Sequence, residues 1–178
     1  MKTITGSLLI FFFSGFFQLE NNNVVYALQE RIGDTTNGIS NFINTSDSSL
    51  PTGWYFIVDS VKGHKRILEK SSQYYYLDSQ PFLNAKDIGE LSVFQNEKGE
   101  IGLKMIFKKN AKSRWERLTE ISYKESKWIG FVLDNRLLYR AIVVNGKLSD
   151  GIADPVFAGY TKEDVEVVKE QIQTEGYR

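Results

Sequence analysis

The apolar residues after position 52 fall mostly into short runs with the period of β-strands. The clearest alternation lies at 101–107, where four apolar side chains point one way and the intervening Gly102 and Lys104 point the other. Asp134-Asn135-Arg136 joins two of the other runs, which therefore form a hairpin candidate. The polar residues 62–66 predict a solvated turn. Further strand-like runs lie at 54–61, 67–68, 74–77, 88–94, 128–133 and 137–144.

Two segments instead show the spacing of amphipathic helices. Ala111, Trp115 and Leu118 recur at helical intervals, with Asn110 in the position of an N-cap. Near the C-terminus, Thr161 begins a Ser/Thr-x-x-acid capping pattern. The apolar face of this second helix consists of Val165, Val168 and Ile172. Two such helices and about six strands predict an α+β fold, a mostly antiparallel sheet with both amphipathic helices packed on one face.

The first 52 residues have a different character. Residues 1–27 predict a secretory signal peptide, because Lys2 precedes the apolar run 7–17 and small residues near Ala27 offer a cleavage site. The apolar run is too short to span a bilayer, which takes about 20 residues. Residues 28–52 are rich in Asn, Ser, Thr and Gly and predict a flexible linker. We therefore expect an exported protein, periplasmic or extracellular, with one folded domain at 53–178 and no transmembrane span in the mature chain.

Composition excludes several classes of function. The 178 residues include 22 basic and 22 acidic side chains, so no net positive charge favours nucleic acid. The chain has no cysteine and one histidine, which excludes disulfides, thiolate metal sites and multi-histidine centres. We expect no metal and no cofactor. His64 is the one imidazole that could act as a base, and no G-x-S-x-G elbow accompanies it.

Four features in the second half of the chain occur in a fixed order. They are the alternating strand 101–107, Arg117-Leu118-Thr119 at a helix end, the run 128–137 with the sequence WIGFVLDNRL, and the segment 157–164 with the sequence FAGYTKED. In these features the chain resembles the periplasmic head domain of the SecD and SecDF protein-export subunits. The resemblance runs over roughly residues 81–176, without the transmembrane part of that family. In the segment 157–164 a glycine, an aromatic residue and a threonine introduce an acidic helix start, as in the family.

The resemblance implies a binding module that engages exported polypeptide, or another envelope protein, and performs no covalent reaction. Exposed strand edges pair with a peptide backbone, and aromatic residues beside them receive its side chains. The candidate residues for such a surface are Trp54, Tyr74, Tyr75, Tyr76 and Trp128.

A basic stretch offers a second candidate surface. A docking patch for an acidic partner or for anionic membrane headgroups would use Lys108, Lys109, Lys112, Arg114 and Arg117. The alternative is a solvated helix face. Two other functions stay open for the whole chain, a small secreted hydrolase and an inhibitor or immunity-type protein.

Overall fold

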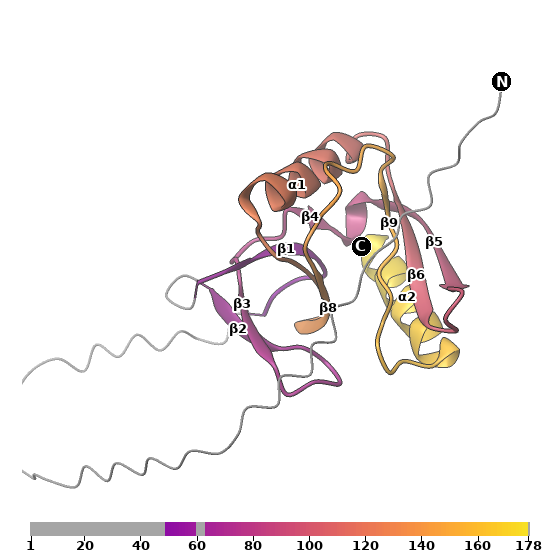
Figure 1. Ribbon diagram of the computed structural model, residues 1–178. Coiled ribbons are helices and arrows are strands. Elements are labelled where there is room, and N and C mark those ends of the chain that lie inside the picture. Colours follow the sequence, from indigo (N-terminus) through magenta and orange to yellow (C-terminus); the bar gives the residue numbers. More distant parts are fainter. Residues whose placement is uncertain (1–48, 60–62, 178) are drawn as a thin grey trace, which may run out of the picture. The chain divides into compact units, whose positions relative to one another are not determined.

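A computed structural model describes residues 49–59 and 63–177 (Figure 1). The predicted signal peptide and most of the predicted linker lie outside these residues. The α+β class is confirmed, since antiparallel strands and two α-helices make up the described part. In chain order the elements are β1 (Gly53–Val58), β2 (His64–Ile67), β3 (Tyr74–Leu77), β4 (Leu83–Asn84), the 3-10 helix η1 (Ala85–Asp87), β5 (Ile88–Gln95), β6 (Ile101–Phe107), α1 (Lys112–Glu125), β7 (Ile129–Leu133), β8 (Arg136–Ala141), β9 (Ile152–Ala153) and α2 (Lys162–Gly176).

The larger sheet has six strands and curls until its two ends meet. Its order is β2-β3-β1-β7-β8, with β4 paired to the start of β1. Leu68 and Leu137 form a parallel bridge between the terminal strands, and the N–H of Glu69 donates to the carbonyl of Leu137 at 2.8 Å. A small apolar cluster fills the inside of the curl. Its buried members are Leu50, Tyr55, Leu77, Val132 and Leu137.

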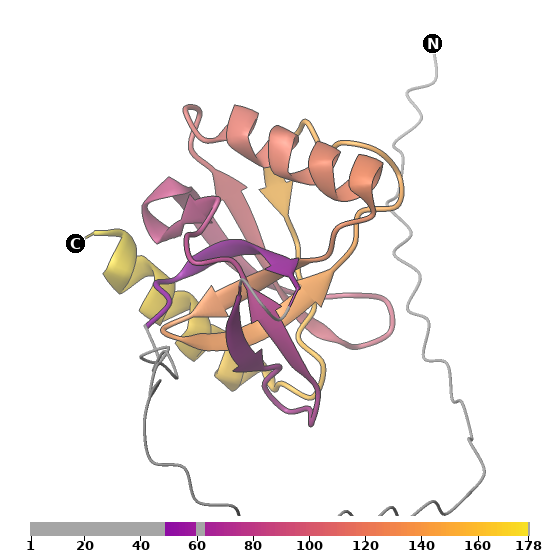
Figure 2. The same ribbon diagram turned by 90° about the vertical axis from the view of Figure 1, so that its left-hand side faces the viewer.

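The smaller sheet has three strands in the order β5-β6-β9. One side of β6 pairs with β5 along 88–95, and the other side meets the segment 151–157. Lys104 is exposed on this sheet, whereas Leu103, Met105 and Phe107 are buried, which confirms the predicted alternation. Helix α2 lies against β5 and β6 (Figures 1 and 2).

A single apolar core joins the two sheets and both helices. Helix α1 contributes Trp115 and Leu118, and α2 contributes Val165, Val168 and Ile172. Near its centre, the ring of Trp54 lies 5.3 Å from the rings of both Trp115 and Phe131. The strands therefore form two sheets around this core, where the sequence suggested one sheet.

The predicted signals at chain reversals differ in outcome. Thr161 caps α2, and its hydroxyl accepts a hydrogen bond from the N–H of Asp164, as expected. Asp134 and Asn135 turn the β7–β8 hairpin with φ values of 42° and 69°, which confirms the hairpin. Asn110, however, does not cap α1. The N-cap is Ala111, because the turn at 108–111 runs directly into the helix. The Ala111 side chain makes no capping hydrogen bond.

The solvated turn predicted at 62–66 is wrong from His64 onward. Residues His64–Ile67 form β2 and pair with β3, and Arg66 is only 8% exposed. The Arg66 guanidinium donates from Nη1 to the backbone carbonyl of Lys65 at 2.6 Å and from Nε to Asn135 Oδ1 at 2.9 Å. Its Nη2 also donates to Asn135 Oδ1. A charged residue therefore enters a strand here because a turn amide and a backbone carbonyl accept its hydrogen bonds.

Candidate functional site

The structure separates the five predicted aromatic residues into three places. Trp54 is 2% exposed and lies in the main core, where Phe131 and Trp115 surround it. Its bulk stabilises the fold, and no partner reaches it in this conformation, so Trp54 is not carried into the proposal below. The other four aromatic residues lie on the larger sheet or directly beside it.

Tyr74 and Tyr76 share one face of the β2–β3 hairpin with Lys65 and Ile67. The register pairs Ile67 with Tyr74 and Lys65 with Tyr76, and directly paired residues point to the same side of a sheet. Ile67 is 62% exposed and Tyr74 is 54% exposed. The Lys65 ammonium lies 4.0 Å from the centre of the Tyr74 ring. We call these four residues the outer hairpin face, which combines apolar surface with one cation.

Tyr75 and Trp128 are joined by a residue that sequence reasoning missed. The Arg140 guanidinium lies 4.7 Å from the centre of the Tyr75 ring and 4.3 Å from that of Trp128. Arg140 lies on β8, where it pairs with Gly130 of β7. Arginine favours such stacking on aromatic faces. The two aromatic residues thus hold an arginine in place, and Trp128 remains partly exposed.

The predicted basic patch is less uniform than the sequence suggests. Lys108, Lys109, Lys112 and Arg117 are exposed. Arg114 forms an ion pair with Asp87, a buried carboxylate that also accepts the N–H of Asn84 at the start of η1. Arg114 therefore anchors η1 to α1. A docking role for the four exposed residues stays a prediction.

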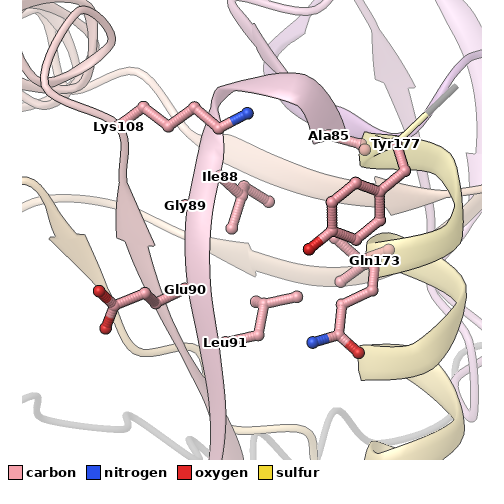
Figure 3. Close-up of a pocket in the computed structure, with 10 residues that line it drawn as sticks. Ala85, Ile88, Gly89, Glu90, Leu91, Lys108, Gln173 and Tyr177 are labelled. Atoms are coloured by element: carbon pink, nitrogen blue, oxygen red, sulfur yellow. The ribbon is translucent and has the colours of Figure 1, made fainter.

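A cavity of about 370 Å³ opens between the start of β5 and the end of α2 (Figure 3). Its lining includes the polar side chains of Glu90, Lys108, Gln173 and Tyr177. Figure 3 shows Leu91 directed toward α2 and Glu90 directed away from it. The apolar floor consists of Ala85, Ile88, Leu91 and Ile172. Nothing in the sequence pattern marked this pocket, because its walls come from residues 85–91, Lys108 and residues 172–177, which are far apart in the chain.

Comparison with known proteins identifies the fold. No family model matches the sequence, and no curated protein matches it. Solved structures of SecDF match it, among them the following two. One is of the membrane component SecDF that enhances protein export, and the other is of SecDF in its Super-membrane-facing form. The chain has a SecDF-like fold. Both alignments have a TM-score of 0.54 at 13% sequence identity.

The SecDF-like fold covers most of this chain and only part of its matches. The alignments take in 69% and 72% of this chain, but 61% of the first SecDF chain and 19% of the second. This chain thus spans less than two thirds of either matched structure. Within residues 49–59 and 63–177, no helix is long and apolar enough to cross a membrane. The resemblance expected from the sequence is confirmed at the level of the fold.

His64 begins β2 opposite Leu77, at the margin of the curled sheet. In the described part of the chain, no three His, Asp or Glu residues converge on a metal position. Burial raises the pKa of Tyr139 to about 12 and also raises the pKa of Asp154. Tyr139 packs edge-on against Trp54 and Phe157, so its shift follows from its place in the core.

Proposed function

We propose that this protein is an exported, non-enzymatic domain that binds polypeptide or another envelope protein. The observation that carries the proposal is the SecDF-like fold, since the matched SecDF is described as a membrane component that enhances protein export. A domain of this fold without a covalent reaction contributes to export by holding a chain through side-chain and main-chain contacts.

The surface chemistry of the larger sheet supports this proposal. The outer hairpin face presents Ile67 and Tyr74 to solvent side by side. Exposed apolar and aromatic side chains in one patch are typical of protein-binding surfaces. Lys65 adds a positive charge to this surface, because its ammonium lies over the exposed Tyr74 ring. Trp128 with Arg140 provides a second stacking surface on the same sheet.

Export itself is part of the proposal. Residues 1–27 would direct the chain out of the cytoplasm, and residues 28–52 would form a flexible linker in front of the folded domain at 53–178. Mass spectrometry of the protein recovered from its host tests this division. We expect a mature N-terminus near Leu28, and a soluble species that retains Met1 would contradict the export signal.

Binding is tested with a fluorescein-labelled, permanently unfolded polypeptide followed by fluorescence anisotropy. We expect saturable binding, weakened about tenfold by Ile67→Ser combined with Tyr74→Ser, since each change removes apolar contact area. Val144→Ser is the matched control, because Val144 is 60% exposed and Ile67 is 62% exposed. The proposed function fails if the unmodified chain binds no unfolded polypeptide and captures no envelope protein.

A further inference from the structure

We propose that the outer edge of β5 and the pocket at its start form one binding site for an extended polypeptide segment, with a large apolar side chain of that segment in the pocket. The inference rests on the proposed function for the nature of the partner. It adds the place, the backbone geometry and the kind of side chain that the site accepts.

Strand pairing on the smaller sheet leaves β5 as its open side. The far side of β6 is occupied along its whole length, because Phe107 N–H donates to Gly151 O, Leu103 N–H to Pro155 O, and Phe157 N–H to Ile101 O. The outer edge of β5 pairs with no strand in the described part of the chain. It is eight residues long. A row of main-chain donors and acceptors is therefore available to another extended backbone.

The sequence of β5 has few of the features that keep an exposed strand edge from pairing with another chain. Natural edge strands are protected by short length, proline, lysine or bulges. β5 reads IGELSVFQ, with no proline and no basic residue. Its protective feature is an irregular register between Ile88 and Glu90, which places Gly89 in a bulge at the pocket. From Leu91 to Gln95 the pairing with β6 is regular, so the edge offers a straight template.

The pocket selects for an apolar side chain next to that template. Its volume of about 370 Å³ leaves room for a large side chain. The floor between Ile88, Leu91 and Ile172 offers no charge. A bulge changes the direction of a strand locally. Here it places the exposed Gly89, which has no side chain, at the entrance of the pocket.

The rim sets the preferred charge beside the apolar side chain. Lys108 extends toward Tyr177 across the upper side of the pocket, while Glu90 points away from it (Figure 3). Among the other polar residues of the lining, Gln173 and Tyr177 are neutral, and the Glu90 carboxylate is directed away from α2. An acidic residue next to the apolar anchor is therefore favoured over a basic one at this rim.

The test uses a fluorescein-labelled nine-residue peptide, Ser-Thr-Val-Thr-Phe-Thr-Val-Thr-Ser, and the full chain. Gln173→Trp fills the pocket from an exposed helix position. Val167→Trp is the matched control, since Val167 is 56% exposed on the same helix outside this pocket. We expect at least tenfold weaker binding for Gln173→Trp, unchanged binding for Val167→Trp, and at least tenfold weaker binding when the peptide phenylalanine becomes alanine.

Backbone pairing has its own readout. Two peptides carry N-methyl groups on alternate residues, one set on each edge of the extended peptide. Because a strand pairs through one edge, we expect one set to abolish binding and the other to leave it within about twofold. Replacing the residue beside phenylalanine with Glu strengthens binding relative to Lys, and Lys108→Ala removes that preference.

The outcomes separate the two proposals. Binding of the unfolded polypeptide that ignores Gln173→Trp, with equal effects of both N-methyl sets, overturns the β5 site and leaves the proposed function standing. Absence of binding to any polypeptide overturns both. Sedimentation of the chain alone is expected to give a monomer. A dimer that the peptide dissociates assigns the edge to a second copy and overturns the inference.

Discussion

Both sheets of this protein are built from antiparallel strands, but the larger sheet closes on itself and the smaller sheet keeps an open edge strand. The six-stranded sheet curls until Leu68 meets Leu137, and its interior is filled by a separate apolar cluster. The three-stranded sheet covers one side of β6 with the segment 151–157 and stops at β5 on the other. The curled sheet has its apolar interior enclosed, whereas the smaller sheet keeps an edge and a pocket available.

We relate this difference to two roles, stability in the curled sheet and binding on the smaller sheet. Leu77, Val132 and Leu137 are fully buried inside the curl. On β5, by contrast, Leu91 and Val93 are only half-buried against the core. Fewer buried contacts and an open backbone edge favour local opening, as binding segments commonly require. We therefore expect the curled sheet to carry more of the stability and β5 to exchange its amide hydrogens sooner.

The largest predicted effect compares one apolar residue from each sheet. Leu137→Ala removes a fully buried side chain at the closure of the curl and is expected to cost about 2–5 kcal/mol of unfolding free energy. Val93→Ala on β5 is expected to cost about 1 kcal/mol, because its side chain is only half-buried. Urea denaturation of both variants measures the difference. Equal losses would contradict the division between the sheets.

The next effect concerns the turn that ties the curl to the chain before β1. Asn135 Oδ1 accepts the N–H of Leu50 at 3.0 Å and the Nε of Arg66 at 2.9 Å. Asn135→Gly loses these bonds and keeps a residue suited to the φ of 69°, at a cost of about 1–3 kcal/mol.

Asn135→Ala loses the same bonds and puts alanine, which tolerates the left-handed region less well than asparagine or glycine, at a φ of 69°, which adds about 1 kcal/mol relative to the glycine variant. Thermal unfolding of the two variants separates the side-chain bonds from the backbone. A glycine variant as stable as the original protein would show that the Asn135 side chain contributes nothing to the closure.

Local signals in the sequence predicted most elements and only part of the site. The alternation at 101–107, the capping pattern at Thr161 and the Asp134-Asn135 turn each depend on neighbouring residues, and each is confirmed. The separation into two sheets depends on the pairing of β1 with β3, β4 and β7, which are distant in sequence. No local period encodes such pairing.

The same limit explains the candidate residues. Trp54 and Tyr74 have the same residue class and similar local patterns, yet Trp54 is 2% exposed and Tyr74 is 54% exposed. Exposure follows from which side chains the core covers, and Trp115 of α1 packs on Trp54. Arg140 was missed because its aromatic partners lie on β3 and just before β7. The alternation in β8 would have shown its side but not its neighbours.

A smaller effect tests whether α2 supports the open sheet. Thr161→Ala removes the hydroxyl that accepts the Asp164 N–H and is expected to cost about 1 kcal/mol. Thr161→Ser keeps an equivalent hydroxyl and serves as the control. Because α2 lies on β5 and β6, hydrogen exchange should accelerate in β5 before it changes in β7. Equal acceleration in both strands would contradict separate support of the two sheets.

The smallest effect concerns one ion pair that links the turn after β2 to helix α2. Lys70, in the turn after β2, donates to Asp164 Oδ2 at 2.9 Å and to Gly159 O at 2.8 Å. Hydrogen bonding to the Thr161 backbone, followed by the bond from Lys70, lowers the pKa of Asp164 below its ordinary value of 3.8. A lowered carboxyl pKa stabilises the fold above pH 3.8, and this contribution is lost as the pH falls through the lower folded value.

Carbon-detected NMR titration of Asp164 measures this link. Lys70→Ala should raise the pKa of Asp164 only part of the way toward 3.8, because the backbone of Thr161 remains the larger cause. Full return to 3.8 would make Lys70 the main cause and the contact between the curled sheet and α2 stronger than the structure indicates. No change at all would mean that the β2–β3 turn does not hold α2 in solution, and that the two sheets are joined through their shared core alone.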